Sequence, residues 1–296
     1  MVGRIIRAIS GFYYVQTDDG NVYECKARGN FRRQGITPLV GDFAEISATD
    51  HSNGVVEEIK PRKNELSRPA IANIDKLFIV SSYQTPTPDL LMIDRLTALA
   101  VYHNIEPIIV FNKSDMGDFS DYLNIYKKTG FKTFAVSASK KEGIEPLFME
   151  LKDCVSAFSG NSGVGKSSLL NAFFDNEIKL ATGDVSEKLG RGRHTTRHTE
   201  LFYHKLNGFV ADTPGFSAIE NEKNDFEFKE GLADFFPDFE DYKTNCCFTS
   251  CSHTCEKGCG VIEGVKNGEI SESRHKSYCV IFEELKDLKQ WNIQKK

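Results

Sequence analysis

A stretch of the chain that reads FSGNSGVGKSSL carries the residue types that bind phosphate groups. It follows the pattern GxxxxGK[ST], in which glycines let successive backbone N–H groups turn toward phosphate oxygens at a helix amino terminus. Lys166 would reach the β and γ phosphates, and the Ser167 hydroxyl would bind Mg²⁺. A chance match in a chain of this size is on the order of one in a hundred, given average glycine usage. The residues expected to line the phosphates are Gly160, Asn161, Ser162, Gly163, Val164, Gly165, Lys166, Ser167 and Ser168.

A second stretch, FNKSD, has the residues that select a guanine base. A carboxylate only accepts hydrogen bonds, so Asp115 matches the adjacent N1 and N2 donors of guanine, whereas adenine would leave it unpaired. Asn112 and Lys113 would brace and cover the base. The short stretch SAS fits a backbone contact to guanine O6. The residues expected at the base are Asn112, Lys113, Ser114, Asp115, Ser137, Ala138 and Ser139.

Two further motifs follow the phosphate loop and would sense the γ phosphate. In VADTPGF, Asp212 can hold Mg²⁺ through water, and the N–H of Gly215 can meet the γ phosphate. The segment GRGRHTTRHTE offers Thr195 or Thr196 as the switch threonine that closes over the metal. The sequence leaves the choice between the two threonines open.

The elements that must position these motifs alternate between strands and helices over residues 65–218. Buried strands such as KLFIVSSY and EPIIVF end where the motifs begin, and a helix is predicted after Thr87 as its cap, with Pro88 at the first helical position. This alternation predicts a largely parallel sheet with helices on both faces. Ligand loops should then lie at the carboxyl ends of the strands.

Different patterns flank the alternating region. Residues 1–64 contain five short strands joined by tight turns, which predict a small barrel of the OB-fold type or a similar SH3-like barrel. Residues 219–296 begin with an acidic, Phe-rich segment, continue with a cysteine cluster and end in a helical stripe. That stripe is expected to pack within its own domain, and it comprises Tyr278, Ile281, Phe282, Leu285 and Leu288.

The motifs occur in the order NKSD, SAS, phosphate loop, HTT and DTPG, which is a circular shift of the usual order. Rotation of the order keeps the same site in space, because neighbours in a sheet need not be neighbours in sequence. With a barrel before it and a cysteine cluster after it, the chain resembles the circularly permuted ribosome small-subunit-dependent GTPase A (RsgA) family over essentially its whole length. The resemblance implies an OB-fold RNA-binding barrel, a circularly permuted P-loop GTPase domain and a mainly helical zinc-binding domain.

The resemblance also implies a function. The expected activity is hydrolysis of GTP to GDP and phosphate on the small (30S) ribosomal subunit during late maturation, with Mg²⁺ as cofactor and rRNA as partner. We expect a monomer. The alternative is an RNA-binding module that senses guanine nucleotides with little hydrolysis. A metabolic P-loop kinase fits poorly, because the NKxD and DTPG motifs would have no function in it. The DTPG motif leads directly into the carboxy-terminal domain, so we expect the γ-phosphate sensor to act on that domain.

The sequence lacks the glutamine that orients the attacking water in Ras-like GTPases. Ras-like GTPases carry a glutamine after DxxG that orients the attacking water, and Phe216 occupies this position. Intrinsic hydrolysis should therefore be slow, and a partner could supply a large acceleration. His194 is the candidate for water positioning, as the resemblance also suggests. The alternative is a structural role for this histidine in the switch segment.

Five of the eight cysteines fall between Cys246 and Cys259, which in a cytosolic chain points to a metal before disulfides. The spacing Cys-x4-Cys-x-His-x5-Cys matches the zinc pattern of the family. Three thiolates and an imidazole would form a closed, structural zinc site. Cys247 and Cys255 could each replace a neighbour as ligand. The expected ligands are Cys246, Cys251, His253 and Cys259.

A basic loop follows the third predicted strand. Its cations could grip a phosphate backbone while its aromatic ring stacks on a base. The equally weighted alternative is a solvated loop whose aromatic residue plugs the mouth of the barrel. The residues concerned are Lys26, Arg28, Phe31, Arg32 and Arg33.

Charge and hydropathy limit the remaining possibilities. The formal net charge of -5 argues against a generally basic nucleic-acid coat but permits local basic patches. No run approaches 18 consecutive apolar residues, and the amino terminus meets charged residues too soon for a signal peptide. We therefore expect a cytoplasmic protein that does not enter a membrane.

Overall fold

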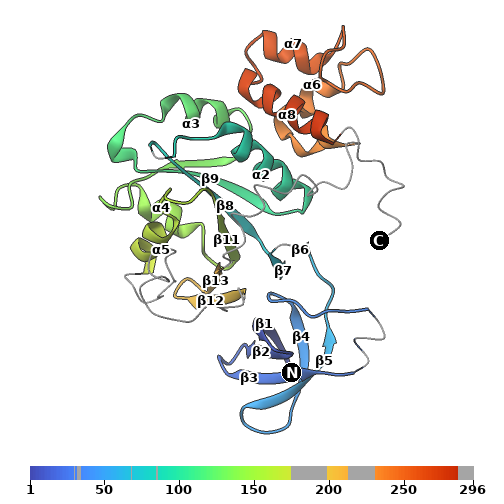
Figure 1. The fold of residues 1–296 in the computed structure, drawn as a ribbon, viewed down its shortest axis with the longest axis vertical. Coiled ribbons are helices and arrows are strands. Elements are labelled where there is room, and N and C mark those ends of the chain that lie inside the picture. The colour runs from blue at the N-terminus through green and yellow to red at the C-terminus, as the bar shows by residue number, and fades with distance from the viewer. Residues whose placement is uncertain are drawn as a thin grey trace.

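The computed structural model describes residues 1–29, 31, 35–67, 69–84, 86–174, 199–212 and 231–285. Its strands form one continuous sheet of eleven strands and a separate two-stranded hairpin. The barrel lies at one end of the molecule and the carboxy-terminal helices lie at the other, with the central sheet between them (Figure 1).

The central part of the sheet has the strand order β10-β9-β8-β11-β13-β12. Neighbouring strands are parallel from β10 to β13, and β12 runs antiparallel to β13. The predicted, largely parallel sheet is confirmed, although β12 was not predicted. The strands are β8 (Lys76–Ser82), β9 (Glu106–Asn112), β10 (Lys132–Ala135), β11 (Val155–Ser159), β12 (Glu200–His204) and β13 (Gly208–Asp212).

Helices cover both faces of this sheet, as the alternating pattern predicts. Leu77 and Ile79 of β8 join the hydrophobic core under α2 and α3, whereas Phe78 and Val80 join the core under α4 and α5. This division follows from the period of two in a strand, which places successive side chains on opposite faces. The helices are α2 (Leu90–Tyr102), α3 (Ser120–Lys127), α4 (Ile144–Met149) and α5 (Lys166–Phe174), and a short 3-10 turn, η1 (Ser114–Met116), follows β9.

The predicted start of α2 is wrong by two residues. Asp89, rather than Thr87, is the N-cap residue, and its carboxylate accepts a hydrogen bond from the Met92 N–H at 3.1 Å. An aspartate that satisfies a free N–H of the first turn is among the best N-caps. Pro88 therefore precedes the helix instead of opening it.

The amino-terminal strands close into a five-stranded barrel in the order β1-β2-β3-β5-β4, with β4 also paired to β1. This is the OB-like barrel that the turn pattern predicts. The small hairpin β6–β7 follows it and leads to the central sheet. The strands are β1 (Val2–Ile9), β2 (Phe12–Thr17), β3 (Val22–Ala27), β4 (Phe43–Ala48), β5 (Asn53–Ile59), β6 (Glu65–Ser67) and β7 (Ala70–Ala72).

The carboxy-terminal region is mainly helical. Tyr278 packs edge-on against Phe236 and Phe239 of the same region, as the predicted stripe requires. Ile281 and Leu285 of the stripe are also buried, and Leu288 lies outside the described residues. The elements are η3 (Leu232–Phe235), η4 (Pro237–Phe239), α6 (Glu240–Lys243), α7 (Gly260–Lys266) and α8 (Glu272–Glu284).

A buried charge network joins α8 to α2 of the central sheet. The Arg274 guanidinium is fully buried and donates to Asp94 at 2.9 Å and to Asp238 at 2.8 Å. Tyr126 and Thr97 complete the network, the first as a donor to Asp94 and the second as an acceptor from Arg274. Burial raises the pKa of Asp94, and the nearby Arg274 guanidinium only partly opposes this rise. The carboxy-terminal helices are thus fastened to the central sheet.

An Arg274→Met variant should lose about 3 to 5 kcal/mol of unfolding free energy, because it leaves buried carboxylates without a counter-charge. Urea unfolding at neutral pH measures this loss. The matched control is Lys276→Met on the same helix. Lys276 is exposed and pairs with exposed Glu272, so its removal should cost no more than about 0.5 kcal/mol. Equal losses in the two variants would contradict the structural role of the buried network.

We expect the free energy of unfolding to depend on pH because of His204, at the end of β12. Its ring is 3% exposed and lies 5.3 Å from the ring of Phe174, and burial lowers the pKa of His204 to about 4. The unfolded chain, with an ordinary histidine pKa, binds the proton more readily. Stability is therefore greatest above about pH 6.5 and falls toward pH 4, by about 2 kcal/mol between pH 7 and pH 5.

Unfolding measured across this pH range checks the prediction. A His204→Gln variant should lack this part of the pH dependence, whereas the same substitution at exposed His51 should retain it. A His204→Gln curve parallel to that of the unmodified chain would show that another group is responsible.

Candidate active site and metal centre

The phosphate loop connects β11 to α5 at the carboxyl edge of the sheet. Gly160 has φ +132°, and a Cβ there would lie 2.0 Å from the carbonyl oxygen of Val80 in the next strand. Gly165 has φ +96°, and a Cβ there would lie 2.2 Å from Nδ2 of Asn112. Only glycine allows both the backbone angles and these close approaches. The pattern of the motif is thus explained by contacts with two neighbouring strands.

The guanine-selecting loop is fastened directly to the phosphate loop. Asn112, at the end of β9, is buried and donates from Nδ2 to the Val164 carbonyl at 2.9 Å. Its Oδ1 accepts from the Ala138 N–H at 3.1 Å. Lys113 donates from Nζ to the Gly163 carbonyl at 2.8 Å. These two side chains therefore join all three of the NKSD, SAS and phosphate-loop segments.

Asp115 is exposed beside the SAS segment. Its carboxylate accepts hydrogen bonds from Ser137 Oγ at 2.5 Å and from Ser139 Oγ at 3.5 Å. The bond from Ser137 is the main cause of the lowered pKa of Asp115. The neighbouring Ser114 N–H donates to the Val136 carbonyl at 3.0 Å, which holds the turn against β10. The group expected to recognise guanine is thus an ionised acceptor in a fixed position.

Lys166, at the start of α5, lies back along the phosphate loop. Its ammonium group donates to the carbonyl oxygens of Gly160 and Asn161. Both carbonyl oxygens belong to the phosphate loop. The ammonium group of Lys166 is therefore held beside the loop that would surround a phosphate. The adjacent Ser167 is half-buried, while Ser162 and Ser168 are exposed.

The γ-phosphate sensors are described only in part. β13 ends at Asp212 and pairs in parallel with β11, so the backbone of Asp212 lies on the strand beside the phosphate-loop strand. The other predicted sensors and the candidate catalytic residues lie outside the described residues, namely Gly215, His194, Thr195 and Thr196.

A cluster of three cysteines and one histidine in the carboxy-terminal region could hold a metal ion. The candidate ligand atoms of Cys246, Cys251, His253 and Cys259 all lie within 4.8 Å of one another. The Cys246 and Cys259 sulfurs are each 3.5 Å from His253 Nδ1 and 3.8 Å from each other. Ligands about 2.3 Å from a tetrahedral ion would lie roughly 3.8 Å apart, so the donor set fits such an ion.

The cluster distinguishes between the competing cysteines. Cys247 and Cys255 are exposed and stand outside it. Burial raises the pKa of the Cys251 thiol to about 12, so this thiol stays protonated unless a cation is present. The four predicted ligands are therefore the ones that converge.

The basic loop of the barrel requires a correction. Phe31 is 4% exposed and belongs to the barrel core with Ile5, Val15 and Val56, so its ring is not available to stack on a base. The alternative, an aromatic residue that plugs the barrel, describes it correctly.

The cations of this loop are placed only in part. Lys26 is exposed with its ammonium 5.0 Å from the Phe12 ring, and Arg28 pairs with Glu57 at 2.7 Å. Arg32 and Arg33 lie outside the described residues.

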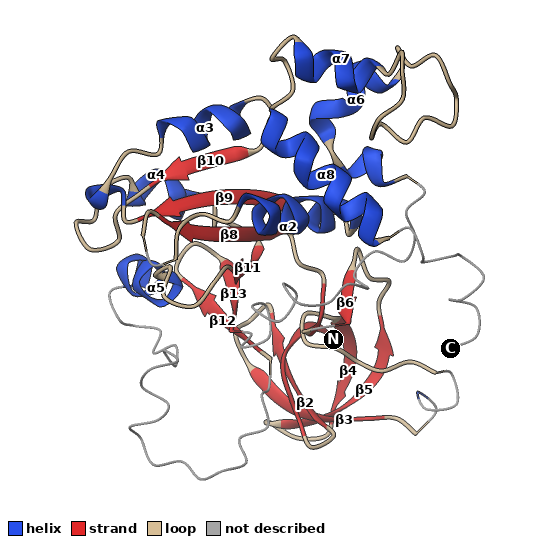
Figure 2. Cartoon of the chain, turned by 45° about the horizontal axis from the view of Figure 1, so that its top comes forward, coloured by secondary structure: helices blue, strands red, loops and turns tan. Residues whose placement is uncertain are grey.

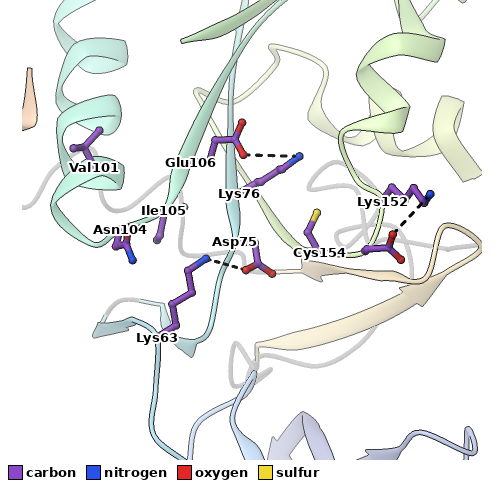
Figure 3. Close-up of a pocket in the computed structure, with 10 residues that line it drawn as sticks. Lys63, Asp75, Lys76, Val101, Asn104, Ile105, Glu106, Lys152 and Cys154 are labelled. Atoms are coloured by element: carbon purple, nitrogen blue, oxygen red, sulfur yellow. Dashed lines mark hydrogen bonds and ion pairs between the residues drawn. The ribbon is translucent and has the colours of Figure 1, made fainter. Parts of the chain in front are cut away.

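A hollow of about 570 Å³ lies at the opposite, amino edge of the central sheet (Figure 3). Its charged side chains are paired with one another, for example Lys63 with Asp75 at 3.0 Å and Lys76 with Glu106 at 3.9 Å. Because the hollow lies at the amino edge, it is on the side of the sheet opposite the phosphate loop and is not the nucleotide site.

Among the helices that the structure describes, none has the length and apolar character needed to cross a bilayer.

Three features define the class of protein: the strand order, the glycine-rich phosphate loop and the NKSD loop that is hydrogen-bonded to it. In chain order the guanine-selecting strand β9 precedes the phosphate-loop strand β11, yet their loops meet in space. The fold and the site are those of a circularly permuted P-loop GTPase.

Comparison with known proteins identifies the family. The model of the RsgA GTPase matches residues 59–222, and that of the RsgA N-terminal domain matches residues 2–56. A "Small ribosomal subunit biogenesis GTPase RsgA" from Caldanaerobacter subterraneus is 44% identical, and the alignment covers 96% of each chain. A relative of the same description from Alkaliphilus metalliredigens is 42% identical over 98% of this chain and 99% of its own.

Two solved structures share the whole fold. YjeQ from Thermotoga maritima has a TM-score of 0.83 and 34% identity, covering 97% of this chain and 99% of its own. YloQ, described as a circularly permuted GTPase, has a TM-score of 0.80 and 36% identity, covering 97% and 96%. The chain belongs to the RsgA family and is a GTP-hydrolysing enzyme.

Proposed function

We propose that this GTPase acts in the biogenesis of the small (30S) ribosomal subunit and hydrolyses GTP to GDP and phosphate when bound to that subunit. Guanine-nucleotide binding is supported above all by one observation: Asn112 and Lys113 donate hydrogen bonds directly to carbonyl groups of the phosphate loop. The partner is inferred from the printed descriptions of relatives that align over nearly the full chain. We also propose that the protein works as a monomer in the cytoplasm.

In this proposal the site residues have distinct roles. Asp115 accepts from guanine N1 and N2, and the SAS backbone contacts O6. The backbone of the phosphate loop and the ammonium group of Lys166 bind the β and γ phosphates. Mg²⁺, when bound through Ser167 and Asp212, supplies positive charge to the phosphate oxygens. Gly215 and either Thr195 or Thr196 sense the γ phosphate.

We assign water positioning to His194, because Phe216 cannot form the required hydrogen bond. A His194→Ala variant should lose subunit-stimulated turnover by about 100-fold, the lower range for a positioned acid or base. Its affinity for GTP should be unchanged. His198→Ala in the same segment is the matched control and should keep its turnover. Full stimulated turnover in the His194→Ala variant would exclude the catalytic role.

We further propose that the ion in the cysteine cluster is Zn²⁺. Three thiolates and one imidazole suit zinc, and four protein ligands leave no open position for catalysis. This site is structural. It holds the loop between α6 and α7 against the hydrophobic core to which Cys259 belongs.

Contact with rRNA is assigned to the cations of the barrel loop. Lys26, Arg28, Arg32 and Arg33 would bind phosphate groups, whereas the ring of Phe31 is buried in the barrel core. Such contacts are local, which agrees with the acidic net charge of the chain.

Co-sedimentation tests the proposed partner. The purified protein is mixed with isolated small or large ribosomal subunits in the presence of GDP or a non-hydrolysable GTP analogue. We expect sedimentation with small subunits, stronger with the analogue, and none above background with large subunits. Equal sedimentation with both subunits would contradict the assigned partner.

The second candidate is a guanine-nucleotide sensor that binds RNA with little hydrolysis. The presence of Phe216 in place of a water-orienting glutamine favours it. A sensor would sediment with small subunits in the same way, but the subunits would not increase its GTP turnover.

A further inference from the structure

Strand β1 belongs both to the barrel and to the central sheet. Its first residues pair with β4 and thereby close the barrel, whereas Arg7, further along, pairs with Glu200 of β12. The eleven-stranded sheet is continuous because of this single junction. Figure 2 shows the β12–β13 hairpin between the barrel and the rest of the central sheet.

Two arginine side chains of β1 reinforce the junction. The Arg4 guanidinium lies 4.1 Å from the Phe43 ring of the barrel and 5.5 Å from the Phe209 ring of β13. The Arg7 guanidinium lies 4.0 Å from the Tyr14 ring of the barrel, and its Nη1 is 3.6 Å from Glu200 Oε1. Each arginine of β1 therefore contacts both the barrel and the hairpin.

The hairpin leads directly to the nucleotide site. Glu200 is opposite Asp212 in the β12–β13 register, and Asp212 is the first residue of the DTPG motif. Glu200 also follows the HTT segment by only a few residues. The same residue thus pairs with the barrel on one side and with the γ-phosphate motif on the other.

The distance between Arg7 and Glu200 could shorten or lengthen. A separation of 3.6 Å is an ion pair but is too long for a hydrogen bond. Arg7 Nε is buried without a hydrogen-bond partner among the described residues. A small shift of β12 would therefore tighten or loosen this pair, and an interaction that differs between two states is what couples two sites.

We infer that the Arg7–Glu200 pair is a positioning device that transmits subunit binding at the barrel to Asp212 and so regulates GTP hydrolysis. The inference rests on the proposed function, since it assumes that the subunit stimulates turnover. Coupling of this kind is reciprocal for binding. The nucleotide state should accordingly alter β1, just as occupation of the barrel alters the nucleotide site.

Charge reversal tests the pair. Arg7→Glu and Glu200→Arg each place like charges together, and each should lower stimulated turnover at saturating small subunits by about tenfold. Basal hydrolysis and GTP affinity should stay within about twofold, because neither residue belongs to the nucleotide site. The double reversal, Arg7→Glu with Glu200→Arg, should restore most of the stimulation.

Lys60→Glu is the matched control, since the ion pairs of Lys60, with Glu45 and Glu58, lie within the barrel. It should keep full stimulation. A loss of stimulation in the Arg7→Glu variant that the double reversal does not restore would overturn the inference. Undiminished stimulation in both single variants would do the same.

Hydrogen exchange separates this inference from the proposed function. In the free protein, the amides of β1 should exchange at different rates with GDP and with a non-hydrolysable GTP analogue. Glu200→Arg should remove most of that difference. If subunits fail to stimulate the unmodified protein, the proposed function fails, and identical exchange of β1 in the two nucleotide states would still decide against the coupling.

Discussion

An Asp115→Asn variant is expected to lose GTP affinity by about 10⁴-fold, the discrimination that a site built for hydrogen bonding can reach. The new amide NH₂ would face the amino group at C2 of guanine, donor against donor. Xanthine carries a carbonyl at that position, so the variant should bind XTP in preference to GTP. The Ser137 hydroxyl can still donate to the asparagine carbonyl, which keeps the loop in place.

Equilibrium titration with GTP and XTP measures this exchange of specificity. The matched control is Asp118→Asn, three residues further on. Asp118 is exposed and accepts hydrogen bonds from Ser120, within its own turn. The control should bind GTP as the unmodified chain does. An Asp115→Asn variant with unchanged GTP affinity would refute the assignment of the guanine-selecting residue.

Removal of one metal ligand should have the second large effect. Structural zinc contributes roughly 10 to 16 kcal/mol in small peptides, which exceeds the stability of most domains. A Cys251→Ser variant should therefore lose its zinc, and the amides of residues 240–270 should become unprotected from exchange. Elemental analysis and hydrogen exchange measure the two changes.

Cys247→Ser provides the control for the metal site, because Cys247 is exposed and outside the cluster. It should keep one zinc per chain. Retention of a full equivalent of zinc by the Cys251→Ser variant would contradict the ligand set. The cluster is remote from the phosphate loop, so GTP binding should persist in both variants.

Much of the nucleotide site could be predicted from the sequence because its requirements are local. Gly160 and Gly165 are needed where the backbone turns against β8 and β9, and such a demand leaves a recognisable spacing. The circular shift was equally visible, since it only reorders complete motifs. The barrel and the sheet followed from turn signals and from the alternation of strands and helices.

Other features depend on tertiary contacts and left no local signal. The ring of Phe31 could equally enter the barrel or face solvent until the core around it was known. Thr87 was the predicted cap of α2, but Asp89 is the residue whose carboxylate reaches the Met92 N–H. Strand β12 is five residues long and carries no motif.

Long-range charge pairs were also beyond prediction. Arg274 pairs with Asp94, which lies 180 residues away in the sequence. Arg7 likewise pairs with Glu200, which is also distant in the sequence. Nothing in the neighbouring sequence of either arginine indicates its partner. The choice of Cys246 over Cys247 likewise needed the positions of the other ligands.

The most direct test of the proposed function is GTP hydrolysis by the purified protein, measured alone and with isolated small ribosomal subunits, with large subunits as the control. We predict slow turnover alone, strong stimulation by small subunits and none by large subunits. Tight GTP binding without stimulation by small subunits would contradict a subunit-activated GTPase and favour the nucleotide sensor.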